Sequence, residues 1–195
     1  QVIKDTPVNV IANKNVSYII LQNGKVYAFG EGYGTTPVLL ELGYDIVDIS
    51  NSYMVDINGN VYDLATKTRL EIVEKIKYIS EGATHTVFLS EEKTAYAIGS
   101  NTFGQFGDGT NVSNETEVVA IRNKDLTDVL RDIEKIEAGN SYTVAVLETG
   151  ETVEFGSNQY GQLGTDEIGE TNTIRENTFV TSLLNETNES IILMD

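Results

Sequence analysis

Short apolar runs separated by turn residues recur along most of the chain. Residues 142–147 and 152–155 flank Thr149-Gly150, and Asn23-Gly24 separates two similar runs nearer the start. The runs hold four to six residues and are rich in β-branched and aromatic side chains, which is typical of strands. Asn-Gly between two apolar runs is a strong signal for a β-hairpin. The pattern therefore predicts an all-β protein built from successive hairpins.

One stretch of this pattern occurs twice, and every matched position is displaced by the same interval. Residues 79–109 read ISEGATHTVFLSEEKTAYAIGSNTFGQFGDG, and residues 136–164 read IEAGNSYTVAVLETGETVEFGSNQYGQLG. A fixed period without insertions indicates one structural unit used more than once. Each copy predicts three strands followed by a glycine-rich loop. The pairs that match are Gly82/Gly139, Gly99/Gly156, Asn101/Asn158, Gly104/Gly161, Gln105/Gln162 and Gly107/Gly164.

The glycine-rich loop has two interpretations, a structural corner or a phosphate cradle. A phosphate cradle needs a helix whose N-terminus faces the anion, and no helical period follows either copy. We therefore interpret the loop as a corner between strands, in which glycine permits positive φ and close backbone approach.

The two copies resemble the regulator of chromosome condensation (RCC1) repeat. That family forms β-propellers, usually of seven blades with four strands each. Phe106 stands where the repeat usually has Leu, and Tyr142 stands where it usually has His. The residues that match the repeat are Gly82, His85, Leu89, Gly99, Asn101, Gly104, Gln105 and Gly107 in the first copy, and Gly139, Gly150, Phe155, Gly156, Asn158, Tyr160, Gly161, Gln162, Leu163 and Gly164 in the second.

The resemblance implies a single propeller segment over residues 1–195 with about four antiparallel four-stranded blades. Blades are predicted at residues 6–43, 44–75, 76–132 and 133–185, and residues 186–195 would supply a spare strand of a further blade. Their outermost strands are expected at residues 37–41, 70–73, 118–121 and 179–184, and a one- or two-turn helix is expected at residues 122–132.

Four blades do not complete a seven-bladed ring, so the segment is expected to be an open arc or part of a ring. An open arc leaves two apolar faces bare. If about six large side chains lie on such a face, the loss is on the order of 10 kcal/mol, comparable with the whole stability of a domain. We expect excision from a longer chain, association of copies, or a partner docked on the open face. Gln1 in place of Met fits a mature chain or an excised piece.

The net charge and the composition argue against several classes of function. The net charge of −17, with only 13 Lys and Arg, disfavours nucleic acid and anionic membrane surfaces. No apolar run approaches the length of about 18 residues that a membrane-spanning helix needs, so no span is expected. The absence of cysteine excludes disulfides, thiolate metal sites and cysteine nucleophiles.

Few residues are candidates for catalysis or for binding a ligand or metal. His85 is the sole histidine, and we interpret it as a packing residue, as the resemblance implies, in preference to a catalytic base. The Gln105 and Gln162 amides are expected to hydrogen-bond backbone between blades, with ligand binding as the alternative. Residues 56–60 superficially resemble a calcium loop, but Lys67 occupies the twelfth position, so a hairpin turn is predicted. Asp108, Asp166 and Glu167 could collect a cation, although a solvated acidic loop is the better interpretation.

The predicted site residues are therefore structural, and no catalytic residue, cofactor or metal is expected. They are Gly82, His85, Gly99, Asn101, Gly104, Gln105, Gly107, Gly139, Gly156, Asn158, Gly161, Gln162 and Gly164.

Three functions are compatible with this pattern. The first is a non-enzymatic interaction or assembly scaffold whose partner is another protein or further copies of itself. The Asn-, Ile-, Lys- and Glu-rich composition favours a bacterial source, with an extracellular or cell-surface location and a cytoplasmic one as alternative. The second is a carbohydrate-binding or carbohydrate-active propeller that uses Tyr33, Tyr53 and Tyr160, although a small-molecule ligand is not expected. The third, guanine-nucleotide exchange, rests on the family resemblance alone, and the family's basic chromatin-binding segments are missing here.

Overall fold

The chain folds into four antiparallel sheets, seen in a computed structural model that describes residues 5–164 and 170–176. Each sheet is a meander whose neighbouring strands are consecutive in the chain, as the hairpin pattern predicts.

Blade 1 holds β1 (Pro7–Asn13), β2 (Val16–Leu21), β3 (Val26–Gly30) and β4 (Gly34–Leu40). Blade 2 holds β5 (Ile46–Ile49), β6 (Tyr53–Asp56) and β7 (Val61–Asp63). Blade 3 holds β8 (Ile76–Glu81), β9 (His85–Ser90), β10 (Ala95–Gly99) and β11 (Asn114–Ala120). Blade 4 holds β12 (Ile133–Ala138), β13 (Tyr142–Leu147), β14 (Thr152–Ser157) and β15 (Glu170–Glu176).

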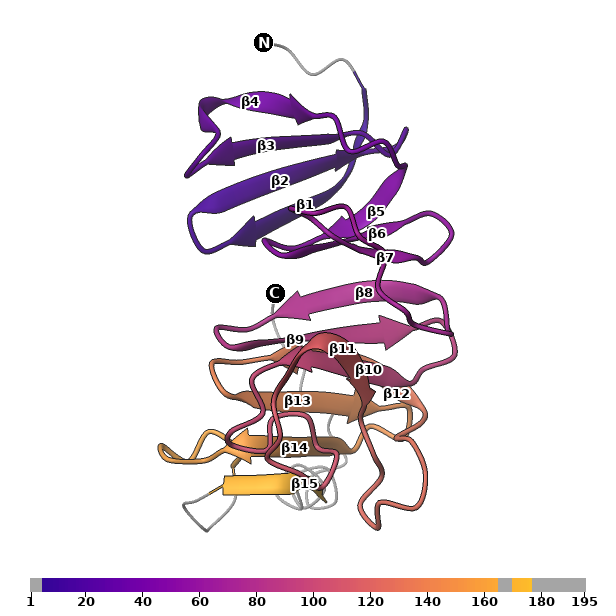
Figure 1. Ribbon diagram of the computed structural model, residues 1–195, viewed down its shortest axis with the longest axis vertical. Coiled ribbons are helices and arrows are strands. Elements are labelled where there is room, and N and C mark those ends of the chain that lie inside the picture. Colours follow the sequence, from indigo (N-terminus) through magenta and orange to yellow (C-terminus); the bar gives the residue numbers. More distant parts are fainter. Residues whose placement is uncertain (1–4, 165–169, 177–195) are drawn as a thin grey trace, which may run out of the picture.

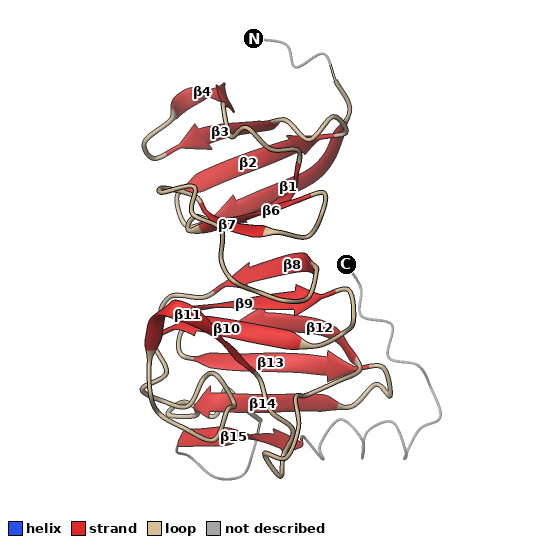
Figure 2. Cartoon of the chain, turned by 45° about the vertical axis from the view of Figure 1, so that its right-hand side comes forward, coloured by secondary structure: helices blue, strands red, loops and turns tan. Residues whose placement is uncertain are grey.

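The blades follow one another along the molecule, with blade 1 at one end and blade 4 at the other (Figures 1 and 2). The expectation of an all-β arrangement of about four blades is confirmed. The first strand of every blade carries a bulge at the same place. The bulge directly follows the first paired residue of the strand, which is Pro7, Ile46, Ile76 or Ile133. A bulge bends the strand and increases its twist, so the four blades share one local shape.

Three apolar cores lie between adjacent blades. We call the face of a blade that meets the preceding blade its A face, and the face that meets the following blade its B face. Between blades 1 and 2 the core comprises Tyr18, Ile20, Val26 and Ala28 from the B face and Ile46, Ile49, Met54 and Tyr62 from the A face. The second core joins Val55 and Val61 to Ile76, Ile79, Phe88 and Ile98, and the third joins Val87, Leu89, Ala95 and Ala97 to Ile133, Ile136, Ala145, Val153 and Phe155.

A backbone hydrogen bond accompanies each core. The first residue of the inner strand donates its N–H to a carbonyl in the turn between the second and third strands of the blade before it. The pairs are Ile46 to Gly24 at 3.0 Å, Ile76 to Gly59 at 2.9 Å and Ile133 to Lys93 at 3.0 Å. Each new blade is therefore aligned on the hairpin turn of the previous one.

Blade 2 departs from the prediction of four strands. It has three strands, and residues 70–73 form no strand. An isolated bridge joins Tyr62 to Arg69, and the Leu70 N–H donates to the Val61 carbonyl at 2.9 Å. The Asp63 carboxylate accepts the N–H groups of Ala65 and Thr66, which turns the chain tightly after β7. The chain therefore returns past β7 as a loop.

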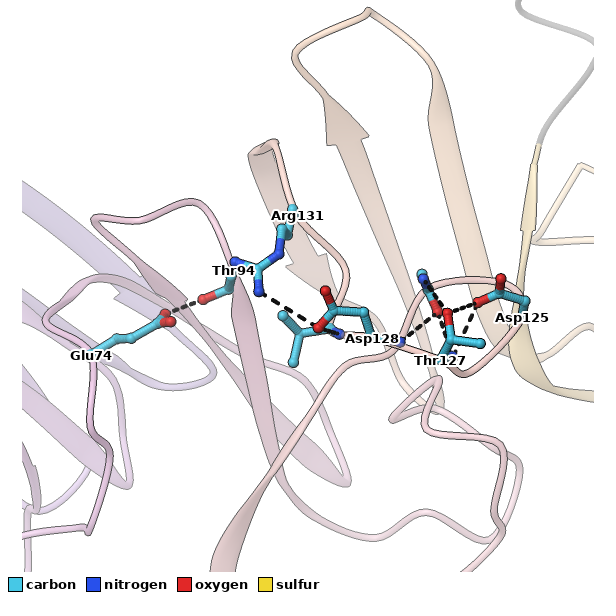
Figure 3. Close-up of polar contacts among 8 residues, drawn as sticks. Glu74, Thr94, Asp125, Thr127, Asp128 and Arg131 are labelled. Carbon is cyan, nitrogen blue, oxygen red and sulfur yellow. Dashed lines mark hydrogen bonds and ion pairs between the residues drawn. The ribbon is translucent and has the colours of Figure 1, made fainter.

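The helix expected at residues 122–132 is also wrong. The segment is a loop closed by a bridge between Arg122 and Val129, and Leu126 has a φ of 63°, which an α-helix does not allow. Thr127 donates its N–H and its hydroxyl to the Asp125 carboxylate (Figure 3). Such local side-chain bonds to the backbone compete with helix formation.

Three outer strands differ from the prediction in position, since β11 also begins at Asn114, four residues before the predicted start. Blade 4 ends with β15 at residues 170–176, whereas the apolar segment 179–184 chosen from sequence lies outside the described residues, as does the spare strand at 186–195. An outermost strand pairs on one side only, so it does not need an apolar sequence. β4 begins at Gly34 and places Pro37 inside the strand, which an edge strand tolerates. Within the described ranges, no helix is long and apolar enough to span a membrane.

The turn slot occupied by Gly24, Gly59, Lys93 and Gly150 offers a matched test of blade packing. Gly24 and Gly150 have φ values of +75° and +85°, so alanine is strained at both. A Cβ on Gly24 would lie 2.6 Å from the Asp45 Cα, whereas a Cβ on Gly150 would meet nothing within 4 Å.

We therefore expect Gly24→Ala to lower the free energy of unfolding by about 2 kcal/mol more than Gly150→Ala. Urea unfolding of both variants measures the difference. Equal losses would show that the turn of blade 1 does not bear on blade 2.

Candidate functional site

The predicted site residues gather in two corner loops. In the loop after β10, the Asn101 side chain accepts the Phe106 N–H at 2.8 Å and donates to the Asp108 carboxylate and the Thr110 carbonyl, both at 3.1 Å. The Gln105 side chain accepts the Phe103 N–H at 2.9 Å and donates to the Thr84 hydroxyl at 3.2 Å. Both partners belong to blade 3, so the expectation that this amide bonds backbone of another blade is wrong. Both side chains are buried, so their amides replace the water that the loop backbone would otherwise bind.

The loop after β14 has the same internal bonds. Asn158 accepts the Leu163 N–H at 2.9 Å, and Gln162 accepts the Tyr160 N–H at 2.8 Å. The two loops differ in exposure. Gln105 is buried, whereas Gln162 is half-buried and the neighbouring Tyr160 is 90 % exposed. Blade 4 covers the first loop, and no described blade covers the second.

The first loop is seated directly on blade 4. A Cβ on Gly107 would lie 2.9 Å from the Phe155 ring, and a Cβ on Gly156 would lie 2.6 Å from the Ser141 carbonyl and 3.2 Å from the Gln105 Cβ. Glycine at these slots therefore permits close packing between blades. The seam extends to Gly82, where a Cβ would lie 2.1 Å from the Gly139 carbonyl.

His85 belongs to the same seam. Its Nε2 lies 2.8 Å from the Thr143 hydroxyl, and this hydroxyl donates to the Gln105 carbonyl at 2.8 Å. Since the hydroxyl proton goes to Gln105, His85 must donate from Nε2, which leaves Nδ1 unprotonated and without a partner among the described residues. Burial lowers the pKa of His85 to about 4. A neutral, buried imidazole that joins two blades fits the packing role predicted for it.

Sequence reasoning missed the carboxylates at the seams. Glu137 of blade 4 accepts the Ser80 hydroxyl at 2.6 Å and the Tyr78 hydroxyl at 2.7 Å, both from blade 3. Burial, and next the hydrogen bond to Glu137, raise the pKa of Tyr78. Ser80 and Glu137 are separated by one full repeat in the sequence. That separation could have suggested the pair, since Gly82 and Gly139, also one repeat apart, meet at the same seam.

Asp48 of blade 2 joins blades 2 and 3. Its buried carboxylate accepts the Ile79 N–H at 2.8 Å and the Ile49 N–H at 3.0 Å. Burial raises the pKa of Asp48 to about 6, although these two backbone bonds act against the rise. Nearby, Glu81 accepts the Ser52 N–H at 3.0 Å and its hydroxyl at 2.9 Å.

Residues 56–60 and Asp108, both considered for a cation, lie in ordinary turns. The Asp56 carboxylate accepts the N–H groups of Asn58 and Asn60, both at 2.9 Å, and the Tyr62 hydroxyl at 3.2 Å. Burial would raise the pKa of Asp56, but these bonds outweigh burial and lower it. Asp108 is bonded to Asn101 and Thr110, and Asp166 and Glu167 lie outside the described residues. No cluster of three metal-ligating side chains occurs in the part of the chain that the structure describes.

The three tyrosines considered for sugar stacking do not come together. Tyr33 packs edge-on against Tyr18 at 6.4 Å, Tyr53 packs edge-on against Phe88 at 5.3 Å, and Tyr160 lies on blade 4. Tyr53 also lines a cleft of about 710 Å³ between blades 2 and 3, at the place where blade 2 lacks an outer strand. Other side chains that line this cleft are Asp63, Arg69, Ile98, Glu115, Glu117 and Val118.

Comparison with known proteins agrees with this geometry. Residues 76–105, which contain β8–β10 and the first half of the corner loop, match the family model of the regulator of chromosome condensation (RCC1) repeat. This stretch is therefore similar to an RCC1 repeat. An RCC1 repeat-containing protein of Dictyostelium discoideum is 39% identical over 87 residues, which cover 45% of this chain and 17% of the relative.

Solved structures extend the likeness of fold to most of the chain. Human WBSCR16 has a TM-score of 0.73 at 17% identity, and the match covers 91% of this chain and 54% of that one. Prp20p from Saccharomyces cerevisiae has a TM-score of 0.69 at 16% identity, and the match covers 86% of this chain and 49% of that one. The four blades thus resemble a segment of an RCC1-type propeller, and the chain spans about half the length of these two proteins.

The burial of His85 predicts a specific dependence of stability on pH. The unfolded chain binds a proton at His85 near pH 6.5 and the folded chain only near pH 4. His85 therefore contributes its full stability above pH 6.5, and this contribution falls as the pH drops through that window. Relative to His85→Gln, which keeps an Nε2 donor, the wild-type protein should lose up to about 3 kcal/mol between pH 6.5 and pH 4.

Urea unfolding of both proteins across this range measures the loss. Asp48, whose raised pKa makes the protein more stable as the pH falls, is present in both proteins. Its contribution therefore cancels in the difference between them. A difference that does not vary with pH would contradict the assignment of His85 as a neutral seam residue.

The two glutamines make the same loop bond at a buried site and at a half-buried site. Gln105→Ala removes from a fully buried site the bond to the Phe103 N–H and the bond to the Thr84 hydroxyl, at a cost of about 2 kcal/mol. Gln162→Ala removes the same internal bond from a half-buried site and should cost under about 1 kcal/mol. Chemical denaturation of the two variants tests this ranking, and a larger loss for Gln162→Ala would be inconsistent with it.

Proposed function

We propose that this chain is a non-enzymatic scaffold for protein–protein interaction or assembly, built from RCC1-type repeats. The observation that supports this best is how the repeated polar residues are used. His85, Asn101 and Gln105 are buried and bonded within one loop or across one seam. Residues that are bonded in this way determine the shape of the blades. We therefore assign recognition of a partner to the loops at the rims and to the end faces of the arc.

The similar proteins support the same proposal. The structure of Prp20p was described together with its binding to Gsp1p and histones, so a propeller of this kind can recognise other proteins. For this chain we infer recognition of a protein partner by the same type of surface, with no nucleic acid bound directly because of the net charge of −17. A bacterial source and an extracellular or cell-surface location, with the cytoplasm as alternative, remain predictions from composition.

A carbohydrate-binding function is the second candidate, favoured by the cleft between blades 2 and 3. Tyr53 and Arg69 line that cleft together with several carboxylates, and aromatic rings with charged neighbours suit a sugar. Against it, Tyr53 packs on Phe88, which holds the ring in the core. A glycan array distinguishes the two candidates, because binding that is lost in Tyr53→Ala would favour the sugar.

The scaffold proposal is tested by reconstitution from purified components. Proteins that co-purify with the tagged chain are expressed separately and titrated against it by calorimetry. We expect saturable binding that substitutions on a rim or end face weaken at least tenfold, with no acceleration of nucleotide release from a guanine-nucleotide-binding protein. Catalytic exchange, or glycoside hydrolysis abolished by replacing one carboxylate, would show that the chain is an enzyme.

A further inference from the structure

Blade 2 lacks the corner loop that blade 3 has between its third and fourth strands. In blade 3, residues 100–113 connect β10 to β11. In blade 2, only residues 64–67 separate Asp63 from Thr68, whose carbonyl accepts the Asp63 N–H at 2.9 Å. The chain therefore returns at once along β7, and blade 2 places no loop against blade 3 like the one that blade 3 places against blade 4.

The missing loop has a consequence at Thr86 of blade 3. Thr86 and Thr143 hold the same position in their blades, each in the register pair nearest the turn between the first two strands. The Thr143 hydroxyl donates to the Gln105 carbonyl of the corner loop and lies 2.8 Å from Nε2 of His85. Thr86 is also buried, at 4 % exposed, yet its hydroxyl has no hydrogen-bond partner among the described residues.

A short loop in the preceding blade does not require an unbonded hydroxyl. Blade 1 also has a short loop, residues 31–33, and blade 2 holds Met54 in the position of Thr86. Met54 is fully buried in an apolar core. A buried hydroxyl without a partner costs free energy, whereas an apolar side chain there does not. Thr86 therefore points to a hydrogen-bonding partner that is not among the described residues.

Thr86 lines a hollow of about 220 Å³ on the A face of blade 3. This hollow shares Tyr53, Ile98 and Glu115 with the cleft of about 710 Å³ between blades 2 and 3. Pockets of this size hold a drug-sized ligand, and by the same measure a few residues of a chain, but no folded surface. Both lie between the two middle blades, so what adjoins blade 1 or blade 4 does not decide whether they are open.

The cleft carries an excess of negative charge. The hollow beside it adds one side chain of each sign, Lys14 and Glu81. Burial, and next the charges of Asp63, Glu81 and Glu115, raise the pKa of Tyr53, so these carboxylates act on one place. A cleft lined by charges of one sign attracts the opposite charge. The charged side chains that line the cleft are four carboxylates and one guanidinium, those of Asp63, Glu71, Glu115, Glu117 and Arg69.

The charge and the bonding pattern indicate what fits the cleft. Residues 165–169 and 177–195 of this chain contain no Lys or Arg, and a second copy carries a net charge of −17, so neither complements the cleft. The partner of Thr143 is a backbone carbonyl, so the same position in blade 3 suits a polypeptide. β11 is the outermost strand of blade 3, and an extended segment can pair with such an edge.

We propose that the cleft between blades 2 and 3 binds a short basic segment of another protein, whose backbone takes the place of the missing corner loop at Thr86. This proposal rests on the scaffold function and names the surface and the kind of partner. A backbone carbonyl of the segment accepts the Thr86 hydroxyl, as Gln105 accepts that of Thr143. Lys or Arg side chains of the segment pair with Glu115 and Glu117, and an apolar side chain contacts Ile98.

The test starts from a random dodecapeptide library displayed on phage and selected on the full chain. Enriched peptides are titrated by fluorescence polarisation against the wild-type protein and three variants. Thr86→Val removes only the hydroxyl, and Glu115→Lys reverses a charge on the cleft wall. The matched control is Glu92→Lys, which makes the same charge change at an exposed residue in the turn at the other end of β9.

We expect the enriched peptides to be rich in Lys and Arg. Glu115→Lys should weaken their binding by about tenfold or more, Thr86→Val by about fivefold, and Glu92→Lys by no more than about twofold. Raising the salt concentration from about 50 to 500 mM should weaken binding to the wild-type protein, because it screens the charges. Urea unfolding should find Thr86→Val at least as stable as the wild-type protein, since the hydroxyl has no partner in the free chain.

Four results would overturn the proposal. They are no enrichment, enrichment of acidic or uncharged peptides, equal binding to the wild-type protein, Thr86→Val and Glu115→Lys, and a glycan in place of a peptide as the ligand lost in Thr86→Val. A purified protein partner that binds Glu115→Lys as strongly as the wild-type protein would leave the scaffold function standing without this site. Basic peptides bound in the cleft, with no protein partner recovered, would leave the site standing without the scaffold function.

Discussion

Burial of the first strand of each blade against the blade before it is the constraint on which this structure depends. Ile46, Ile76 and Ile133 each enter an apolar core with their side chain and donate their N–H to the preceding turn. A single sheet of three or four strands cannot bury both of its faces alone, so each blade needs its neighbours. This nearest-neighbour requirement explains why the same bulge, turn slot and corner loop recur along the chain.

The polar residues of the repeat follow from the same constraint. Strands that end at a seam leave backbone groups that water cannot reach, and these groups must be paired inside the protein. Asn101 and Gln105 pair them within the loop, Asp48 pairs the Ile79 N–H between blades, and His85 connects to Thr143. The burial that makes these bonds necessary also shifts the pKa values of Asp48 and His85, in opposite directions on the pH scale. Burial between blades is the largest cause of both shifts.

Much of the fold follows from local pattern, and the corrections have physical causes. Asn23-Gly24 and Thr149-Gly150 predict hairpins because their turns are local, and the constant interval between the two copies of the repeat predicts equivalent loops in blades 3 and 4. The number of strands in blade 2 was not predictable, because Asp63 turns the chain through its own side chain. The helix at residues 122–132 failed because three apolar residues at helical spacing also fit a loop held by Asp125 and Thr127. Glu137 and Asp48 escaped notice because only the packed blades bring them to their partners.

The central claim is that each blade is aligned on the turn of its predecessor, and amide hydrogen exchange tests it most directly. The N–H groups of Ile46, Ile76 and Ile133 begin their strands and bond only across the seam to the preceding blade. Nuclear magnetic resonance should show that all three amides are protected from exchange about as strongly as the amides in the middle of β9 and β13. Exchange of these three amides at the rate of exposed loop amides, with the β9 and β13 amides still protected, would contradict the account, because the blades would then be folded without being joined in this way.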